Sequence, residues 1–147
     1  TEEFAISDEA WLPLVDATLN AYHGMRCGWV VDGLHGVCHG DVTSSYAGET
    51  RSVEGGWHDA ANLTQGPGRT HLSIYALLEL GEALRLSGND GLSARALEEA
   101  AWGVDWSLRM RFAPGIRVLY DDVSYYTDGA SGTDDDVARC SLAADSP

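Results

Sequence analysis

The chain lacks lysine altogether and carries few basic residues of any kind. Lys and Arg together number nine, all of them Arg, against 23 Asp and Glu, which gives a formal net charge of −14 over 147 residues with His neutral. A chain with this charge repels phosphate groups, so the composition argues against nucleic acids and anionic membrane surfaces as partners. The hydrophobic fraction of 44% and the charged fraction of 22% are ordinary for globular proteins, and we expect one domain or part of one.

Long apolar runs and cysteine pairs are also scarce. No run approaches the roughly 18 to 20 apolar residues that span a bilayer, so we expect no membrane-spanning helix. Residues Thr1–Ile6 are acidic rather than basic, so we also expect no signal peptide. The three cysteines are too few for a disulfide scaffold, and Cys38 directly before His39 indicates metal chemistry first.

Apolar spacing predicts three helices. The first covers about Leu12–Tyr22 with Pro13 in its first turn, and the second covers Thr70–Leu86 with an apolar stripe wide enough to be buried on more than one side. Ser87–Gly91 supplies a C-cap and a turn. Residues Ile116–Tyr120 read as a short strand.

The third helix is predicted to end near Met110, with Ser93 as a candidate N-cap. Glu98 and Glu99 are expected on its solvent face. Four residues are expected to face inward: Leu97, Ala101, Val104 and Leu108. Helices joined by long loops predict an all-α protein of α/α architecture.

Residues Gly24–Gly68 show no sustained periodicity, and a segment of that length usually needs a metal, a ligand or a functional site to order it. It contains Cys27, Cys38, His39 and His58, the two thiolates and two imidazoles that tetrahedral Zn²⁺ prefers. The spacing is not that of a zinc finger. The alternatives are a Cys27–Cys38 disulfide, or two buried thiols beside unrelated histidines.

The stretch Val53–Asn62 carries the residues most typical of a catalytic turn. Gly55 and Gly56 allow the backbone to approach a ligand, and Trp57 offers a flat face of the kind on which sugars stack. Asp59 could orient or deprotonate a water. The alternative is a Gly-Gly turn with a buried Trp and a capping Asp.

A second aromatic and acidic segment lies near the C-terminus. Tyr125 and Tyr126 could stack on a sugar, and Asp134–Asp136 could supply oxygen ligands to Ca²⁺. The alternative is a solvated acidic loop with two packed aromatic residues, because adjacent carboxylates usually face water.

Three motifs in order resemble glycoside hydrolase family 9, the inverting cellulases and related exo-glycosidases. Gly55–Asn62 is similar to the family motif Gly-Gly-Trp-(Tyr/His)-Asp-Ala-Gly-Asp. Arg26-Cys27-Gly28 and Gly36-Val37-Cys38-His39 resemble segments of those members that carry an immunoglobulin-like domain before the catalytic one. The resemblance covers roughly Ala10–Met110, and the tail Arg117–Val137 is similar to the Thr-Asp-Gly and Asp-Asp-Asp loops of some bacterial relatives.

The resemblance implies part of an (α/α)6 barrel whose loops form a cleft for a β-linked oligo- or polysaccharide. It also implies a structural zinc held by Cys27, Cys38, His39 and His58. Inversion needs an acid and a base about 6.5 to 9.5 Å apart, so that a water fits between the base and the sugar. In the family both Asp residues of the motif address that water, and the second is the principal base.

The chain departs from the family motif at that base. The first Asp corresponds to Asp59, but the second falls on Asn62, which takes up no proton at neutral pH, and Ala61 replaces a Gly. Either Asn62 is an engineered substitution that traps substrate, or the base has moved to Asp59, or the protein no longer hydrolyses. The last case describes a catalytically inactive carbohydrate-binding homologue.

The resemblance also bears on domain organisation and location. The family's catalytic acid, a Glu, and a sugar-contacting His lie further downstream than residue 147, so residues 1–147 correspond to the N-terminal portion of a catalytic domain. We therefore expect a second chain, or a further part of the gene product, to carry the rest of the barrel. An extracellular or periplasmic bacterial protein is implied, because polymeric substrates lie outside cells.

Overall fold

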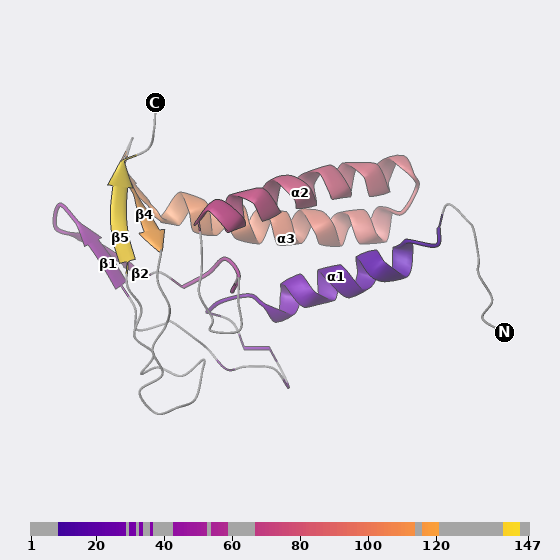
Figure 1. Ribbon diagram of the computed structural model, residues 1–147, viewed down its shortest axis with the longest axis horizontal. Helices are drawn as coiled ribbons and strands as arrows, with labels where there is room; N and C mark the ends of the chain where they lie inside the picture. The colour runs from indigo at the N-terminus through magenta and orange to yellow at the C-terminus, as the bar shows by residue number, and fades with distance from the viewer. Residues whose placement is uncertain are drawn as a thin grey trace.

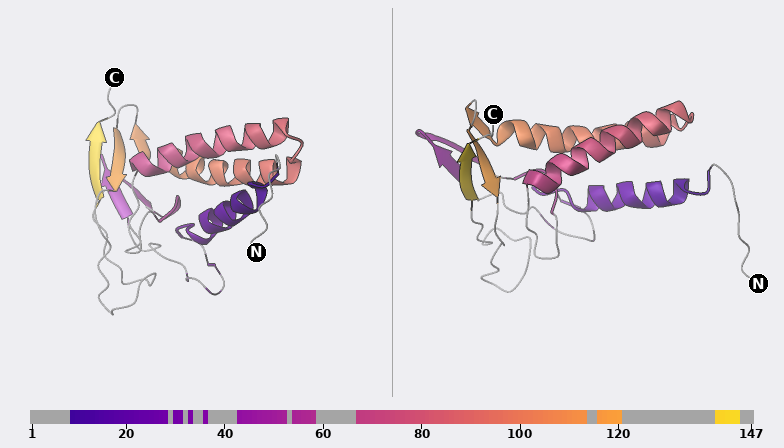
Figure 2. Two further views of the ribbon diagram at one scale, coloured as in Figure 1. Left: turned by 45° about the vertical axis from the view of Figure 1, so that its right-hand side comes forward. Right: turned by 45° about the horizontal axis from the view of Figure 1, so that its top comes forward.

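The computed structural model describes residues 9–28, 30–31, 33, 36, 43–52, 54–58, 67–113, 116–120 and 140–144. The described part is mostly helical, as predicted, with short antiparallel strands. Three helices lie side by side, and the strands gather at one end of them (Figures 1 and 2). Among the helices described, none is long and apolar enough to cross a membrane. These residues do not form a closed barrel, and the finer prediction of a barrel stays open.

Helix α1 spans Leu12–Gly24 and carries Pro13 at its start, as predicted. Proline is tolerated there because the first backbone N–H groups of a helix have no partner within it. Val15 and Leu19 are buried on the face that packs against the other helices. This face brings the end of α1, and the segment that follows it, against α3.

Helices α2, Pro67–Leu86, and α3, Asp90–Arg109, form an antiparallel hairpin. The predicted turn is confirmed: Gly88 has a φ of +78°, which favours glycine, and the N–H of Asn89 donates to the carbonyl of Leu84 at 2.9 Å. The helices approach closely at Gly81, where an added Cβ would lie 2.8 Å from Leu97 Cδ2. Leu77 and Leu84 of α2 are buried in this contact.

The prediction that Ser93 caps α3 was wrong. The N-cap position is Asn89, and it makes no capping bond through its side chain. Ser93 lies inside the helix, where its hydroxyl donates to the carbonyl of Gly81 on α2 at 2.7 Å. The hydroxyl therefore ties the two helices together instead of beginning one of them.

The predicted inward face of α3 was also wrong. Leu97, Val104 and Leu108 are 42%, 37% and 65% exposed. The buried face carries small residues and one large one, namely Ser93, Ala96, Glu99, Ala100, Gly103 and Trp106. Small side chains let α2 and the Trp57 ring approach the helix closely, and this burial outweighs the stronger hydrophobic signal of the Leu and Val stripe.

Two small sheets complete the described structure. Strands β1, Thr43–Tyr46, and β2, Glu49–Ser52, form a hairpin in which Thr43 pairs with Ser52. Strands β3, Arg111–Ala113, β4, Ile116–Tyr120, and β5, Cys140–Ala144, form an antiparallel sheet with β4 in the middle. The strand at Ile116–Tyr120 confirms the prediction, whereas the other strands were not predicted.

Arg51 connects the hairpin to the end of α3. Its Nη1 donates to the carbonyls of Arg109 and Arg111, each at 2.6 Å, and its guanidinium lies 4.7 Å from the centre of the Phe112 ring. These contacts link the segment before Val53 to the helical layer. Arg51 therefore holds the chain against the end of α3 shortly before the Gly55-Gly56 turn.

Candidate functional site

Two of the motifs singled out in the sequence meet in an antiparallel bridge between Arg26 and Trp57. The N–H of Cys27 donates to the carbonyl of Gly56 at 3.0 Å, and the N–H of His58 donates to the carbonyl of Met25 at 2.8 Å. The Arg-Cys-Gly motif and the Gly-Gly-Trp-His motif are thus held side by side, although some thirty positions separate them in the sequence.

The side chains of the bridged pair are anchored to one carboxylate on α3. Glu99 Oε2 accepts from Trp57 Nε1 at 3.2 Å and from Arg26 Nε at 3.1 Å, and Oε1 accepts from Arg26 Nη2 at 2.9 Å. Arg26 and Glu99 are both buried. The Arg26 guanidinium also lies 4.8 Å from the centre of the Trp102 ring. The expectation that Glu99 faces solvent is therefore wrong, because Glu99 is buried and bonded to Arg26 and Trp57.

Trp57 itself belongs to the hydrophobic core. Its side chain is 5% exposed, and its ring meets Tyr22 edge to face at a centroid distance of 5.3 Å. This is the buried Trp of the structural alternative considered above. The indole also forms part of a pocket wall. Its predicted role in stacking on a sugar is not tested by this packing and stays a prediction.

The Gly-Gly turn is explained by packing against α3. Gly55 and Gly56 have φ angles of +107° and +66°, a region that favours glycine. A Cβ on Gly56 would lie 3.1 Å from Trp106 Cδ2, and one on Gly55 would lie 2.9 Å from Trp106 Cδ1. The two glycines therefore bring the backbone against the buried Trp106 indole.

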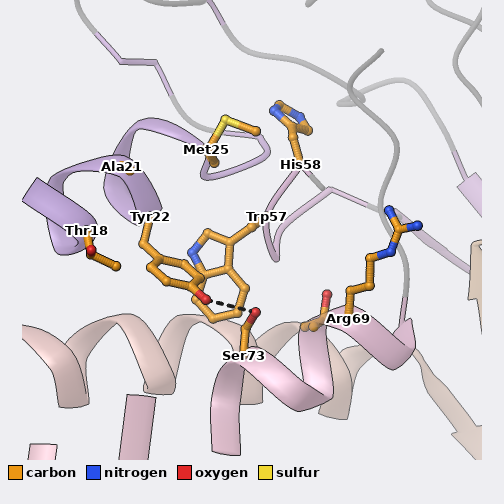
Figure 3. Close-up of a pocket in the computed structure, with 9 residues that line it drawn as sticks. Thr18, Ala21, Tyr22, Met25, Trp57, His58, Arg69 and Ser73 are labelled. Atoms are coloured by element: carbon orange, nitrogen blue, oxygen red, sulfur yellow. Dashed lines mark hydrogen bonds between the residues drawn. The ribbon is translucent and has the colours of Figure 1, made fainter. Parts of the chain in front are cut away.

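Cys27 and His58 are the chain neighbours of the bridged residues Arg26 and Trp57. Successive side chains of paired strands point to alternate faces, so we expect these two neighbours on the face away from the bridged side chains. Figure 3 shows His58 directed away from Trp57. Both residues are buried. Two of the four predicted zinc ligands are therefore diagonal neighbours across the bridge.

The other predicted ligands, Cys38 and His39, lie outside the described residues. Within the described part of the chain, no group of three or more His, Cys, Asp or Glu side chains is close enough to hold a metal ion. The predicted site has four ligands, and only Cys27 and His58 are described. The zinc prediction is therefore neither confirmed nor contradicted.

A pocket of about 320 Å³ opens between the end of α1, the start of α2 and the Trp57–His58 segment (Figure 3). Across it the Tyr22 hydroxyl is hydrogen-bonded to Ser73 Oγ at 3.1 Å. The lining combines hydroxyl, aromatic, basic and aliphatic groups: Thr18, Ala21, Tyr22, Met25, Trp57, His58, Arg69, Thr70 and Ser73. Sites with an apolar wall and a few convergent polar groups are typical ligand sites.

The remaining predicted site residues lie outside the described residues. These are the catalytic candidates Asp59 and Asn62, the aromatic candidates Tyr125 and Tyr126, and the calcium candidates Asp134–Asp136. Asp59 is the residue that follows His58 in the sequence, and His58 lines the pocket. The roles predicted for all of these residues stay predictions.

Sequence reasoning missed Glu99, Ser73 and Trp106 as parts of the site. Glu99 was placed in solvent because an acidic residue in a helix usually faces water. The one available signal was the Arg of the Arg-Cys-Gly motif, since a buried Arg requires an acidic partner. No spacing in the sequence identifies which acidic residue supplies it.

Comparison of the chain with protein-family models, with curated proteins and with solved structures finds no match. The function therefore rests on the residues and the geometry described above.

Proposed function

We propose that this chain forms part of the glycan-binding cleft of an inverting glycoside hydrolase of family 9 type. In this proposal Asp59 positions the attacking water, Asn62 occupies the position of the usual base, and a structural zinc orders the segment that carries both. A catalytically inactive glycan-binding homologue is the second candidate, and Asn62 in place of the carboxylate favours it.

The observation that carries the proposal is the bridge between Arg26 and Trp57. The resemblance rests on separate short motifs, and chance matches have no reason to meet in space. Here Arg26-Cys27-Gly28 and Gly55-Gly56-Trp57-His58 are hydrogen-bonded to each other and anchored on the same carboxylate. This arrangement supports the view that the motifs belong to one functional unit.

The chemistry of the pocket supports a sugar as the ligand. Tyr22, Ser73 and Thr18 offer hydroxyl groups, which both donate and accept hydrogen bonds as sugar hydroxyls do. Trp57 and Tyr22 add aromatic surface suited to the apolar face of a sugar ring. Because His58 lines this pocket, the next residue in the chain, Asp59, is a natural candidate to act on a glycan bound there.

The donor set supports a zinc ion with a structural role. Cys27 and His58 are both buried and are diagonal neighbours across the bridge, and a thiolate with an imidazole suits Zn²⁺ better than Mg²⁺ or Ca²⁺. Cys38 and His39 would complete four protein ligands, which leaves no open position for a reacting water. The ion would supply folding energy to a segment with little apolar core, and the chemistry would belong to Asp59 and its partners.

Helices α2 and α3 each carry a stripe of exposed apolar side chains, which supports the proposal that further helices cover them. Leu72, Tyr75 and Leu86 share the face of α2 opposite its buried residues, and Leu97, Val104 and Leu108 form the stripe on α3. Helices with apolar residues on two faces are typical of multilayer helical folds. We therefore propose that further helices, on a second chain or elsewhere in the gene product, pack here to complete the barrel.

The substitution Asn62→Asp tests activity. It is made in the full-length gene product, and any second chain that native mass spectrometry finds bound to it is included in the assay. A positioned general base contributes about 10²- to 10⁴-fold to a rate, so hydrolysis of a soluble β-glucan should rise by that order. The measurement is the release of reducing ends, with the anomeric configuration of the product followed by NMR to verify inversion.

The double variant Asn62→Asp with Asp59→Asn is the matched control, because it has the same number of carboxylates at the turn as the parent. If Asp59 positions the water, this double variant should not show the increase in hydrolysis rate expected for Asn62→Asp. If neither the parent nor Asn62→Asp cleaves any β-glucan, yet both bind one, the hydrolase proposal is wrong and the inactive homologue stands.

A further inference from the structure

The Glu99 carboxylate is the point at which three separate segments of the chain meet. Besides Arg26 and Trp57, it lies 3.5 Å from His23 Nδ1 at the end of α1. Glu99 is 4% exposed and Arg26 is 5% exposed, so both charges are buried. The oxygens of one side chain on α3 therefore contact the end of α1, the Arg-Cys-Gly motif and the Gly-Gly-Trp motif.

Stability alone gives little reason to bury this ion pair. Each charge loses its hydration when it is buried, and an apolar pair of similar volume is often as stable or more so. The Glu99 carboxylate does, however, accept hydrogen bonds from two nitrogens of Arg26 and from the Trp57 indole. These bonds fix the orientation of the two side chains as well as their distance from Glu99. The geometry thus defines how the two bridged residues sit relative to each other.

The register of the bridge sets the separation of Cys27 and His58. Each is the direct neighbour of a residue that Glu99 holds, and each donates its backbone N–H across the bridge. A shift of either segment along the other would change the distance between the thiol and the imidazole. Zinc tolerates ligand distances within only about 0.2 Å of its preferred values.

We propose that Glu99 is a positioning residue that holds the Arg26–Cys27 and Trp57–His58 segments in register, and through them the zinc ligands Cys27 and His58. The metal part of this inference rests on the proposed function. Outer residues that orient metal ligands typically change metal affinity by about 10- to 100-fold when they are altered.

The experiment compares Glu99→Gln with Glu98→Gln. Glu98 Oε1 accepts from the same Arg26 Nη2 at 3.1 Å, but its side chain is 68% exposed, so it is a matched control from the same helix. Competition with a chromophoric chelator measures zinc affinity at a temperature at which all variants are folded. Glu99→Gln should bind zinc about 10- to 100-fold more weakly, and Glu98→Gln should stay close to the parent.

Glu99→Gln leaves the Arg26 charge buried without its main partner and could prevent folding. The double variant Glu99→Gln with Arg26→Met removes both charges and keeps an acceptor for the Trp57 indole. It should recover stability but not zinc affinity, because the bidentate contact that sets the register is gone. A double variant that binds zinc as tightly as the parent contradicts the proposal.

Amide hydrogen exchange on the metal-free proteins provides a second readout. The N–H groups of Cys27 and His58 should be protected in the parent and in Glu98→Gln, and exchange faster in the two Glu99 variants. Equal protection in all four proteins overturns the positioning role. A parent that binds no zinc contradicts the proposed metal site instead, and amide exchange then still decides whether Glu99 sets the register.

Discussion

Replacing Trp57 with alanine is expected to lower the free energy of unfolding by about 3–5 kcal/mol, the usual cost of removing a buried aromatic side chain. Trp57 is packed in the core cluster with Leu19 and Leu77, and its ring meets Tyr22. The substitution also takes the indole donor away from the buried Glu99 carboxylate. Chemical denaturation followed by circular dichroism measures the change.

The control is Trp11→Ala, the same substitution at a side chain that is 38% exposed. It should cost less, because Trp11 is far more exposed than Trp57 and does not belong to the core cluster. If the two variants are equally stable and Trp57→Ala loses only glycan affinity, Trp57 is a binding residue rather than a core residue. That result would also support the sugar-stacking role predicted for its flat face.

Replacing Gly103 with alanine is expected to destabilise the protein by about 1–3 kcal/mol, the usual cost of overpacking a core. A Cβ at this position would lie 2.5 Å from Trp57 Cη2 and Cζ3 and 2.7 Å from Ile74 Cγ1. The rigid indole cannot swing away freely, because its N–H is bonded to Glu99 at the other end. The contact distorts either the ring position or the helix pair, and thermal unfolding detects it.

Gly91→Ala is the matched control in the same helix. Nothing lies within 4 Å of a Cβ at Gly91, so the better helix propensity of alanine should stabilise the protein by up to about 1 kcal/mol. The two substitutions therefore have opposite expected signs. A Gly103→Ala variant as stable as Gly91→Ala would show that the Trp57 ring does not pack against α3 as described.

Local signals in the sequence were enough to predict the helices and the turn between two of them. Pro13 and the apolar spacing located α1, and Gly88 located the end of α2. These features depend on neighbouring residues, which a single sequence displays. The strand Ile116–Tyr120 was predicted for the same reason, from a short apolar run that follows Pro114-Gly115 in the sequence.

The buried face of α3 could not be predicted in this way. Leu97, Val104 and Leu108 carry the strongest hydrophobic signal in the helix, yet they are exposed in this chain. The buried face of α3 is the one that packs against Trp57. The Trp57 ring comes from a distant part of the sequence and fills the space beside Gly103. Which residues a helix buries thus depends on a long-range contact that helical periodicity does not encode.

The candidate site shows the same division. The residues at the bridge belong to motifs that the sequence displays, so Cys27, Trp57 and His58 could be singled out. The carboxylate that holds them could not, because Glu98 and Glu99 are adjacent and alike in the sequence. Only the packing of α3 decides that Glu99 is buried while the Glu98 side chain is 68% exposed.

X-ray absorption at the zinc edge, on protein purified without chelators, tests the central claim most directly. The account predicts one zinc per chain with two sulfur ligands at about 2.3 Å and two nitrogen ligands at about 2.0–2.1 Å. Substitution of Cys27 or His58 should remove one ligand of the matching type. Protein that holds no zinc, and instead has a disulfide between Cys27 and Cys38, would contradict the account.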